Sequence, residues 1–189
     1  MREAMSQAGF HGKLPARGDF VGLGLPPGFL RPWEDWMQAV MAGSKQLLGE
    51  AWLPAWMQAP IWRFLLPAGT CGPAAMVGLW LPSVDRVGRY YPLTIARPLD
   101  GPPQSAAPWL EQAEAAGLAA LEADLTPEAL AARLATPPEH NGQPALLPAM
   151  AGHGLWWTLG AQVAPPGGLP DTTTFAAMLN PAASGLMPG

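Results

Sequence analysis

Positively charged side chains gather in two short segments of this sequence, residues 12–20 and 82–92. The chain has ten Lys and Arg residues, and four of them lie here: Lys13, Arg17, Arg86 and Arg89. An Arg guanidinium is a planar, always-charged fork that suits carboxylate and phosphate groups. Asp19 and Asp85 are the internal partners that these cations could find, and Ser83 adds a hydroxyl. Three interpretations stay open: a salt-bridge network that braces the loops on the core, a patch that binds a partner or ligand, and a catalytic site.

Catalytic and metal-binding patterns are incomplete in this sequence. Ser83, in the sequence Pro82-Ser83-Val84, lacks the flanking glycines of a nucleophile elbow. No motif ties the three histidines, His11, His140 and His153, to Ser83, and their spacing does not fit a metal site. Cys71 is the only cysteine, which rules out an intrachain disulfide and a Cys-based zinc cluster. We therefore expect no enzyme activity, no cofactor and no metal.

Bulk composition narrows the class of protein further. Apolar residues make up 49% of the 189 residues, as in a globular domain, while charged residues make up only 13%. A net charge of -4 argues against general affinity for nucleic acid. The polar residues 1–9 do not resemble a signal peptide, and no apolar run reaches the roughly 18 residues that span a bilayer. A cytoplasmic protein is the expectation.

Apolar spacing predicts alternating helices and strands. Apolar residues recur at three- and four-residue intervals from Phe29 to Met41, which predicts a buried helix face, and Gly43 is its expected end. Pro54 is expected to break the following helical segment. Strands are predicted at 61–66, 74–81, 91–95 and 155–159, helices at 108–124, after Thr126 and at 171–179, and a linker at 98–108. Most of the nine tryptophans are expected in the core. The interspersed pattern favours an α/β fold.

Several motifs together resemble one known family. Residues 12–20 read Gly-Lys-Leu-Pro-Ala-Arg-Gly-Asp-Phe, and residues 82–93 read Pro-Ser-Val-Asp-Arg-Val-Gly-Arg-Tyr-Tyr-Pro-Leu. With Trp-Glu-Asp-Trp at 33–36 and Ala-Pro-Ile-Trp-Arg-Phe at 59–64, they resemble the TagF/ImpM family of type VI secretion-associated proteins. The similarity is close over residues 9–97 and looser over 154–179.

The resemblance implies a fold and a role. The fold would be a single α/β domain over residues 9–180, with a central mixed sheet flanked by helices in a three-layer sandwich. Residues 1–8 and 181–189 would be flexible ends. The role would be post-translational repression of secretion-system assembly through a forkhead-associated (FHA) scaffold protein, without enzymatic activity. The phosphatase domain fused to some relatives has no room in this chain. The family's polar signature positions are here Lys13, Arg17, Asp19, Ser83, Asp85, Arg86 and Arg89.

Two other functions compete with the binding regulator. Lys13, Arg17, Arg86 and Arg89 could converge on one pocket and form a module that senses a small anion or a nucleotide. Ser83 and Asp85 could instead belong to an unrecognised hydrolase. Neither alternative has a complete sequence motif.

Overall fold

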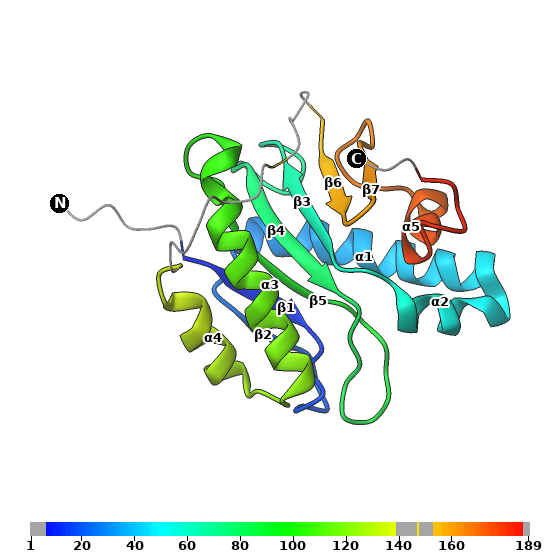
Figure 1. The fold of residues 1–189 in the computed structure, drawn as a ribbon, viewed down its shortest axis with the longest axis horizontal. Helices are drawn as coiled ribbons and strands as arrows, with labels where there is room; N and C mark the ends of the chain where they lie inside the picture. Colours follow the sequence, from blue (N-terminus) through cyan, green and yellow to red (C-terminus); the bar gives the residue numbers. More distant parts are fainter. Residues whose placement is uncertain (1–6, 139–146, 148–152, 187–189) are drawn as a thin grey trace. The chain divides into compact units, whose positions relative to one another are not determined.

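The computed structural model describes residues 7–138, 147 and 153–186 of the chain. Helices and strands are interspersed along it (Figure 1). By their internal contacts the residues form two compact units, Met1–Leu25 with Met76–Leu147, and Pro26–Ala75 with Pro148–Gly189. Three parts of the predictions lie outside the described residues: His140, residues 1–6 of the N-terminal segment and residues 187–189 of the tail.

The first unit holds four strands, which pair in the order β2-β1-β5-β4. They are β1 (Gly9–Gly12), β2 (Val21–Leu23), β4 (Met76–Leu81) and β5 (Leu93–Pro98). β1 lies between two neighbours, so that Phe10 is opposite Leu23 of β2 and Ile95 of β5. Every residue of β4 is buried, as its continuous apolar run predicts for a strand covered on both faces.

Helices of the first unit pack on this sheet. A short 3-10 turn, η2 (Pro103–Ala106), leads into α3 (Ala107–Glu122), which contacts β4 and β5. α4 (Pro127–Ala135) lies beside α3 and contacts β2 (Figure 1). The Thr126 hydroxyl accepts a hydrogen bond from the Ala129 N–H at 3.2 Å and caps α4. The two predicted helices are confirmed, whereas the predicted linker at 98–108 contains η2 and the start of α3.

The second unit combines four helical segments with three strands. The helical segments are α1 (Pro27–Leu48), η1 (Gly49–Ala51), α2 (Trp52–Gln58) and α5 (Thr172–Leu179). The strands β3 (Trp62–Leu66), β6 (Leu155–Thr158) and β7 (Ala161–Val163) pair in that order. α1 packs against α5 and α2. The Asp171 carboxylate caps α5 by accepting a hydrogen bond from the Thr174 N–H at 2.8 Å.

Two predicted helix boundaries are wrong, each for a local reason. α1 continues through Gly43 to Leu48. Gly43 is not a stop but a point of close approach, because a Cβ there would lie 2.4 Å from the Thr172 side chain. Pro54 does not break α2 because it lies in the first turn, where no intrahelical partner for its missing N–H is needed.

Tryptophans build the core of the second unit. The Trp33 ring packs on Phe64 at 4.8 Å and on Trp156 at 5.8 Å between centroids. The indole nitrogens find backbone acceptors, as Trp62 Nε1 donates to Met178 O at 3.0 Å and Trp156 Nε1 to Gly168 O at 2.8 Å. Eight of the nine tryptophans in the whole chain are buried and Trp36 is half-buried, so the predicted core role is confirmed.

The strand pairing corrects one part of the predicted fold class. Strands packed with helices fit the predicted α/β class. The predicted mixed sheet is wrong within both units, where every described strand pair is antiparallel. Short connections explain this: β6 and β7 are joined only by Leu159 and Gly160, which no parallel pair permits. The single-domain organisation and the three-layer arrangement stay predictions.

Candidate functional site

Two loops of the first unit carry the predicted polar residues. The loop of residues 13–20 joins β1 to β2, and the loop of residues 82–92 joins β4 to β5. Leu14 is fully buried and anchors the first loop, and the Arg17 N–H donates to Leu14 O at 3.0 Å to close a turn. At the loop roots, Gly12 has a φ of +142°, and a Cβ there would lie 2.0 Å from Pro92 O. Only glycine lets the two loops start this close together.

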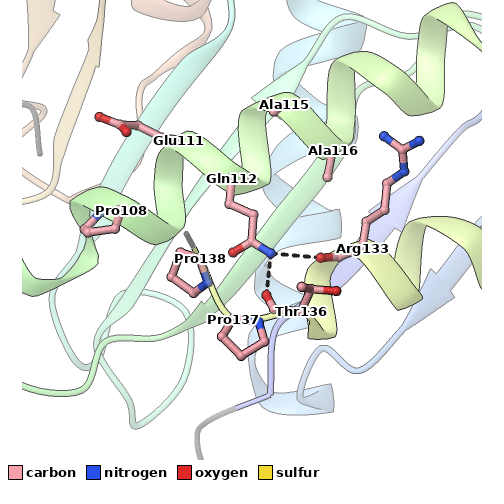
Figure 2. A pocket seen from close by; sticks show the side chains of 9 residues that line it. All are labelled: Pro108, Glu111, Gln112, Ala115, Ala116, Arg133, Thr136, Pro137 and Pro138. Carbon is pink, nitrogen blue, oxygen red and sulfur yellow. Dashed lines mark hydrogen bonds between the residues drawn. The ribbon is translucent and has the colours of Figure 1, made fainter. Parts of the chain in front are cut away.

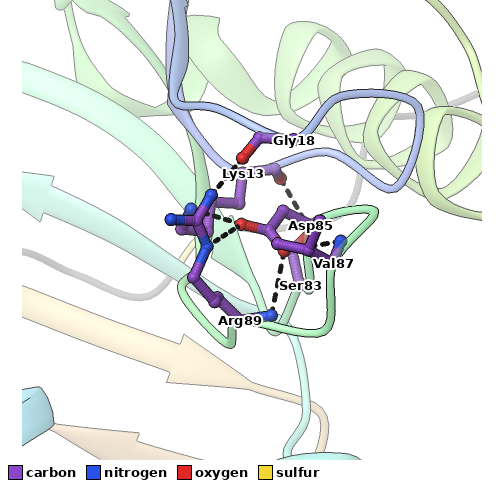
Figure 3. A network of polar contacts seen from close by, with 6 residues as sticks. All are labelled: Lys13, Gly18, Ser83, Asp85, Val87 and Arg89. Carbon is purple, nitrogen blue, oxygen red and sulfur yellow. Dashed lines mark hydrogen bonds and ion pairs between the residues drawn. The ribbon is translucent and has the colours of Figure 1, made fainter.

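Asp85 joins the two loops through its carboxylate (Figure 3). Its Oδ2 atom accepts hydrogen bonds from Lys13 Nζ at 2.6 Å and from Arg89 Nε at 2.7 Å. Its Oδ1 atom accepts from the backbone N–H groups of Val87 at 3.0 Å and Arg89 at 2.9 Å. The carboxylate therefore fixes its own loop and ties it to Lys13 of the other loop.

Further hydrogen bonds run between the same loops. The Ser83 hydroxyl donates to Lys13 O at 2.7 Å, and the Arg86 N–H donates to Arg17 O at 2.9 Å. Arg89 Nη2 donates to Gly18 O (Figure 3). We call the two loops, held by these contacts, the braced platform.

The electrostatics of Asp85 favour the ionised form. Burial raises the pKa of Asp85, but hydrogen bonds from Lys13, from the Arg89 backbone and side chain and from the Val87 N–H outweigh it. The pKa therefore lies well below the usual range for an aspartate. At neutral pH the group is a carboxylate that compensates the buried ammonium of Lys13.

The seven predicted site residues separate into two sets. Lys13, Ser83 and Asp85 are buried and, with the half-exposed Arg89, make the brace. For these the bracing interpretation is what the geometry shows. Arg17, Asp19 and Arg86 have exposed side chains, and Arg17 Nη2 lies 3.8 Å from the carboxylate of exposed Glu128. Their role as binding residues stays a prediction.

Two exposed apolar side chains were missed by sequence reasoning. Phe20 is 52% exposed and Val87 is 68% exposed, and both belong to the braced platform. The Lys13 ammonium lies 4.4 Å from the Phe20 ring centroid, and the Phe20 and Tyr91 rings form a T-shaped pair with centroids 4.8 Å apart. The signal available in the sequence was a large apolar residue at a loop position between charged neighbours.

The geometry gives no support to the hydrolase interpretation. The Ser83 hydroxyl is buried and donates a hydrogen bond to a backbone carbonyl. Both carboxylate oxygens of Asp85 already accept hydrogen bonds within the platform. Burial raises the pKa of the Cys71 thiol to about 12, which keeps that sulfur protonated and unreactive. In the part of the chain that the structure describes, no group of three or more His, Cys, Asp or Glu side chains is placed to hold a metal.

A separate hollow of about 430 Å³ lies between α3 and α4 (Figure 2). Gln112 of α3 reaches across it, and its amide nitrogen donates to the backbone oxygens of Arg133 and Thr136. These bonds satisfy carbonyls at the end of α4, so the contact stabilises a helix terminus. None of the seven predicted site residues lines this hollow.

The fold and the braced platform define a class of protein: helices packed on antiparallel strands, with a rigid pair of loops that presents arginines. A family model described as the TagF N-terminal domain, type VI secretion system-associated, matches residues 9–136. The chain belongs to that family. The match includes both loops of the platform, so the resemblance recognised from their motifs is confirmed.

One solved structure supports the same assignment over most of the chain. It is the crystal structure of PA0076 from Pseudomonas aeruginosa PAO1, which is 32% identical in sequence. The similarity covers 92% of this chain and 94% of PA0076, with a TM-score of 0.77. A comparison with curated proteins found no match. Among the described residues, no helix has the length and apolar character to cross a membrane.

Proposed function

We propose that this chain is a cytoplasmic, non-enzymatic regulator of the type VI secretion system, which represses assembly by binding an FHA scaffold protein of the same system. Membership of the TagF N-terminal domain family over residues 9–136 is the observation that carries this proposal. Family membership establishes the association with type VI secretion. Repression of assembly and binding to the FHA protein are the parts that we propose in addition.

The braced platform supports a binding role. A buried ion pair holds the two loops in one shape. A fixed shape favours binding where the exposed residues of the loops must contact a partner in one geometry. Phe20, Arg86 and Val87 are exposed on loops whose backbones are held by Asp85, Lys13 and Arg17. A surface of this kind binds without first having to be ordered.

The anion-sensing alternative fits the geometry less well. It needs Lys13, Arg17, Arg86 and Arg89 to face a common pocket. Lys13 is buried and, like Arg89, already donates to the Asp85 carboxylate. A phosphate would have to compete with that carboxylate at bonds of 2.6 and 2.7 Å. We expect no thermal shift with inorganic phosphate or nucleotides at millimolar concentration.

A genetic experiment tests the regulatory role. The gene is deleted in a strain whose type VI system is repressed, and export of a secreted structural component is measured. The proposal predicts increased export, which returns to the repressed level when the wild-type chain is supplied again. Unchanged export in a strain whose system is competent when induced would contradict repression.

A binding experiment tests the partner independently. The chain is co-expressed with the FHA scaffold of its own secretion cluster, and co-purification is measured. Stable recovery of both proteins is the expected result. Increased export in the deletion strain, without binding to the scaffold, would support the repressor role and contradict the FHA protein as its partner.

A further inference from the structure

The braced platform carries both exposed apolar side chains and exposed arginines. Among the described residues of the first unit, large exposed apolar side chains occur at Phe20, Leu23, Val87 and Leu118. Two of these belong to the platform, where the neighbouring residues are charged. Exposed aromatic side chains and arginines are the residue types that are enriched in binding hot spots.

The platform holds its apolar side chains in place. The Phe20 ring is covered by the Lys13 ammonium at 4.4 Å, stacks on His11 at 5.6 Å and meets the Tyr91 ring edge-on. The Val87 backbone is fixed by its hydrogen bond to Asp85. Lys13 and Asp85 are themselves joined at 2.6 Å, so the Phe20 ring and the Val87 backbone both contact one ion pair.

The charge of the platform is opposite to that of the chain. The chain has a net charge of -4, but its two platform loops hold four cationic side chains against the carboxylates of Asp19 and Asp85. Asp85 forms ion pairs with Lys13 and Arg89. The exposed Arg86 guanidinium makes no hydrogen bond or ion pair in the part of the chain that the structure describes, and the exposed contact of Arg17 with Glu128 at 3.8 Å is weak. The surface left to a partner is therefore apolar and positively charged.

We infer that Phe20, Arg86 and Val87 form the docking surface for the protein partner, and that this partner presents an acidic patch around an apolar pocket. Arg86 pairs with the acidic patch, while Phe20 and Val87 enter the apolar pocket. Lys13 and Asp85 are positioning residues, which hold the surface but do not touch the partner. This inference rests on the proposed function, since it names the surface used to bind the scaffold.

Calorimetry with purified FHA scaffold of the same cluster tests the surface. Arg86→Glu and Val87→Ser change exposed side chains, so both variants should fold, which thermal unfolding verifies. We expect each to raise Kd at least tenfold, and the wild-type Kd to rise with salt more steeply than that of Arg86→Glu.

Matched variants outside the platform provide the controls. Arg133→Glu makes the same charge reversal at an exposed position of α4, and Met57→Ser removes an apolar side chain that is 67% exposed on α2. Both should bind within twofold of the wild type. Equal affinity of the platform variants and the wild type would overturn the docking surface while leaving the proposed function intact.

Two other outcomes have defined meanings. If the wild type does not bind the scaffold, the FHA partner of the proposed function fails and the inferred surface falls with it. Vesicles that contain phosphatidylserine serve as a second arm. Arg86-dependent co-sedimentation with these vesicles, without scaffold binding, would overturn the choice of a protein partner in favour of an acidic membrane.

Discussion

Asp85 accepts four hydrogen bonds with two carboxylate oxygens, and three of its donors come from its own loop. The fourth, Lys13, comes from 72 residues away and is buried with it. A buried ammonium without a carboxylate is strongly unfavourable, so the two loops are stable together rather than separately. The ion pair of Lys13 and Asp85 is thus the buried charged contact between the two loops, beside the further hydrogen bonds that join them.

Replacing Lys13 by methionine tests this pair. Lys13→Met keeps the apolar stem and removes one charged hydrogen bond, while Asp85 keeps Arg89 and two backbone donors. We expect the free energy of unfolding to fall by about 2 kcal/mol at pH 7. Urea unfolding measures it. Lys45→Met is the control, because Lys45 is exposed over the Trp52 ring and should contribute at most about 1 kcal/mol.

The comparison of wild type with Lys13→Met also gives a prediction about the pH dependence of stability. Because the folded-state pKa of Asp85 is lowered, its stabilising effect is present above the unfolded-state pKa of about 3.9 and is lost as pH falls through the folded value. The stability difference between wild type and Lys13→Met should therefore narrow below roughly pH 4. A difference that stays constant down to pH 2 would contradict the pairing of Lys13 with the ionised Asp85 carboxylate as the source of the effect.

The polar residues of the platform could be predicted from the sequence. Which of them are buried and brace the loops, and which are exposed, could not. Residue type and loop position mark Lys13, Asp85 and Arg86 as a group of charged positions. The pairing of Lys13 with Asp85 depends on β1 and β5 being neighbours, which local patterns do not encode. The exposure of Phe20 and Val87 was equally hidden, because apolar residues are interpreted as core until a structure shows otherwise.

At the scale of elements, α1 and α5 approach each other closely at Gly43, which has no side chain. Gly43 lies inside α1 and faces Thr172 at the start of α5. Glycine costs a helix about 1 kcal/mol relative to alanine, so its presence here needs a packing reason. The Thr172 methyl would be 2.4 Å from a Cβ at Gly43, which is far too close.

Gly43→Ala should therefore destabilise the protein in spite of better helix propensity. We expect a loss of about 2 kcal/mol from overpacking, measured by urea unfolding. Gly28→Ala in the same helix is the control, since its Cβ would be an ordinary 3.8 Å from Pro73 and no loss should follow. Adding Thr172→Ala to Gly43→Ala should restore most of the stability. Equal stability of the two alanine variants would contradict the close approach.

Most elements were predictable because their patterns are local. The apolar run of β4, the spacing of α1 and the Thr-Pro start of α4 each carry their own signal. β2 and β7 were missed because each is three residues long, which is too short for a period to show. Helix ends failed where tertiary packing decided them, as at Gly43.

At the scale of the whole molecule, the platform belongs entirely to the first unit of the chain. A chain with a net charge of -4 repels an acidic partner at long range, so the cationic platform must supply a local attraction. A region of opposite sign also orients the encounter, because it guides the approach of the partner.

Hydrogen–deuterium exchange of the chain, alone and saturated with its FHA scaffold, tests the central claim most directly. Binding through the platform predicts slower amide exchange in residues 14–20 and 84–90 of the complex, with no comparable change in α2 or α5 of the second unit. Slower exchange confined to α2 and α5, with both platform loops unchanged, would contradict the account.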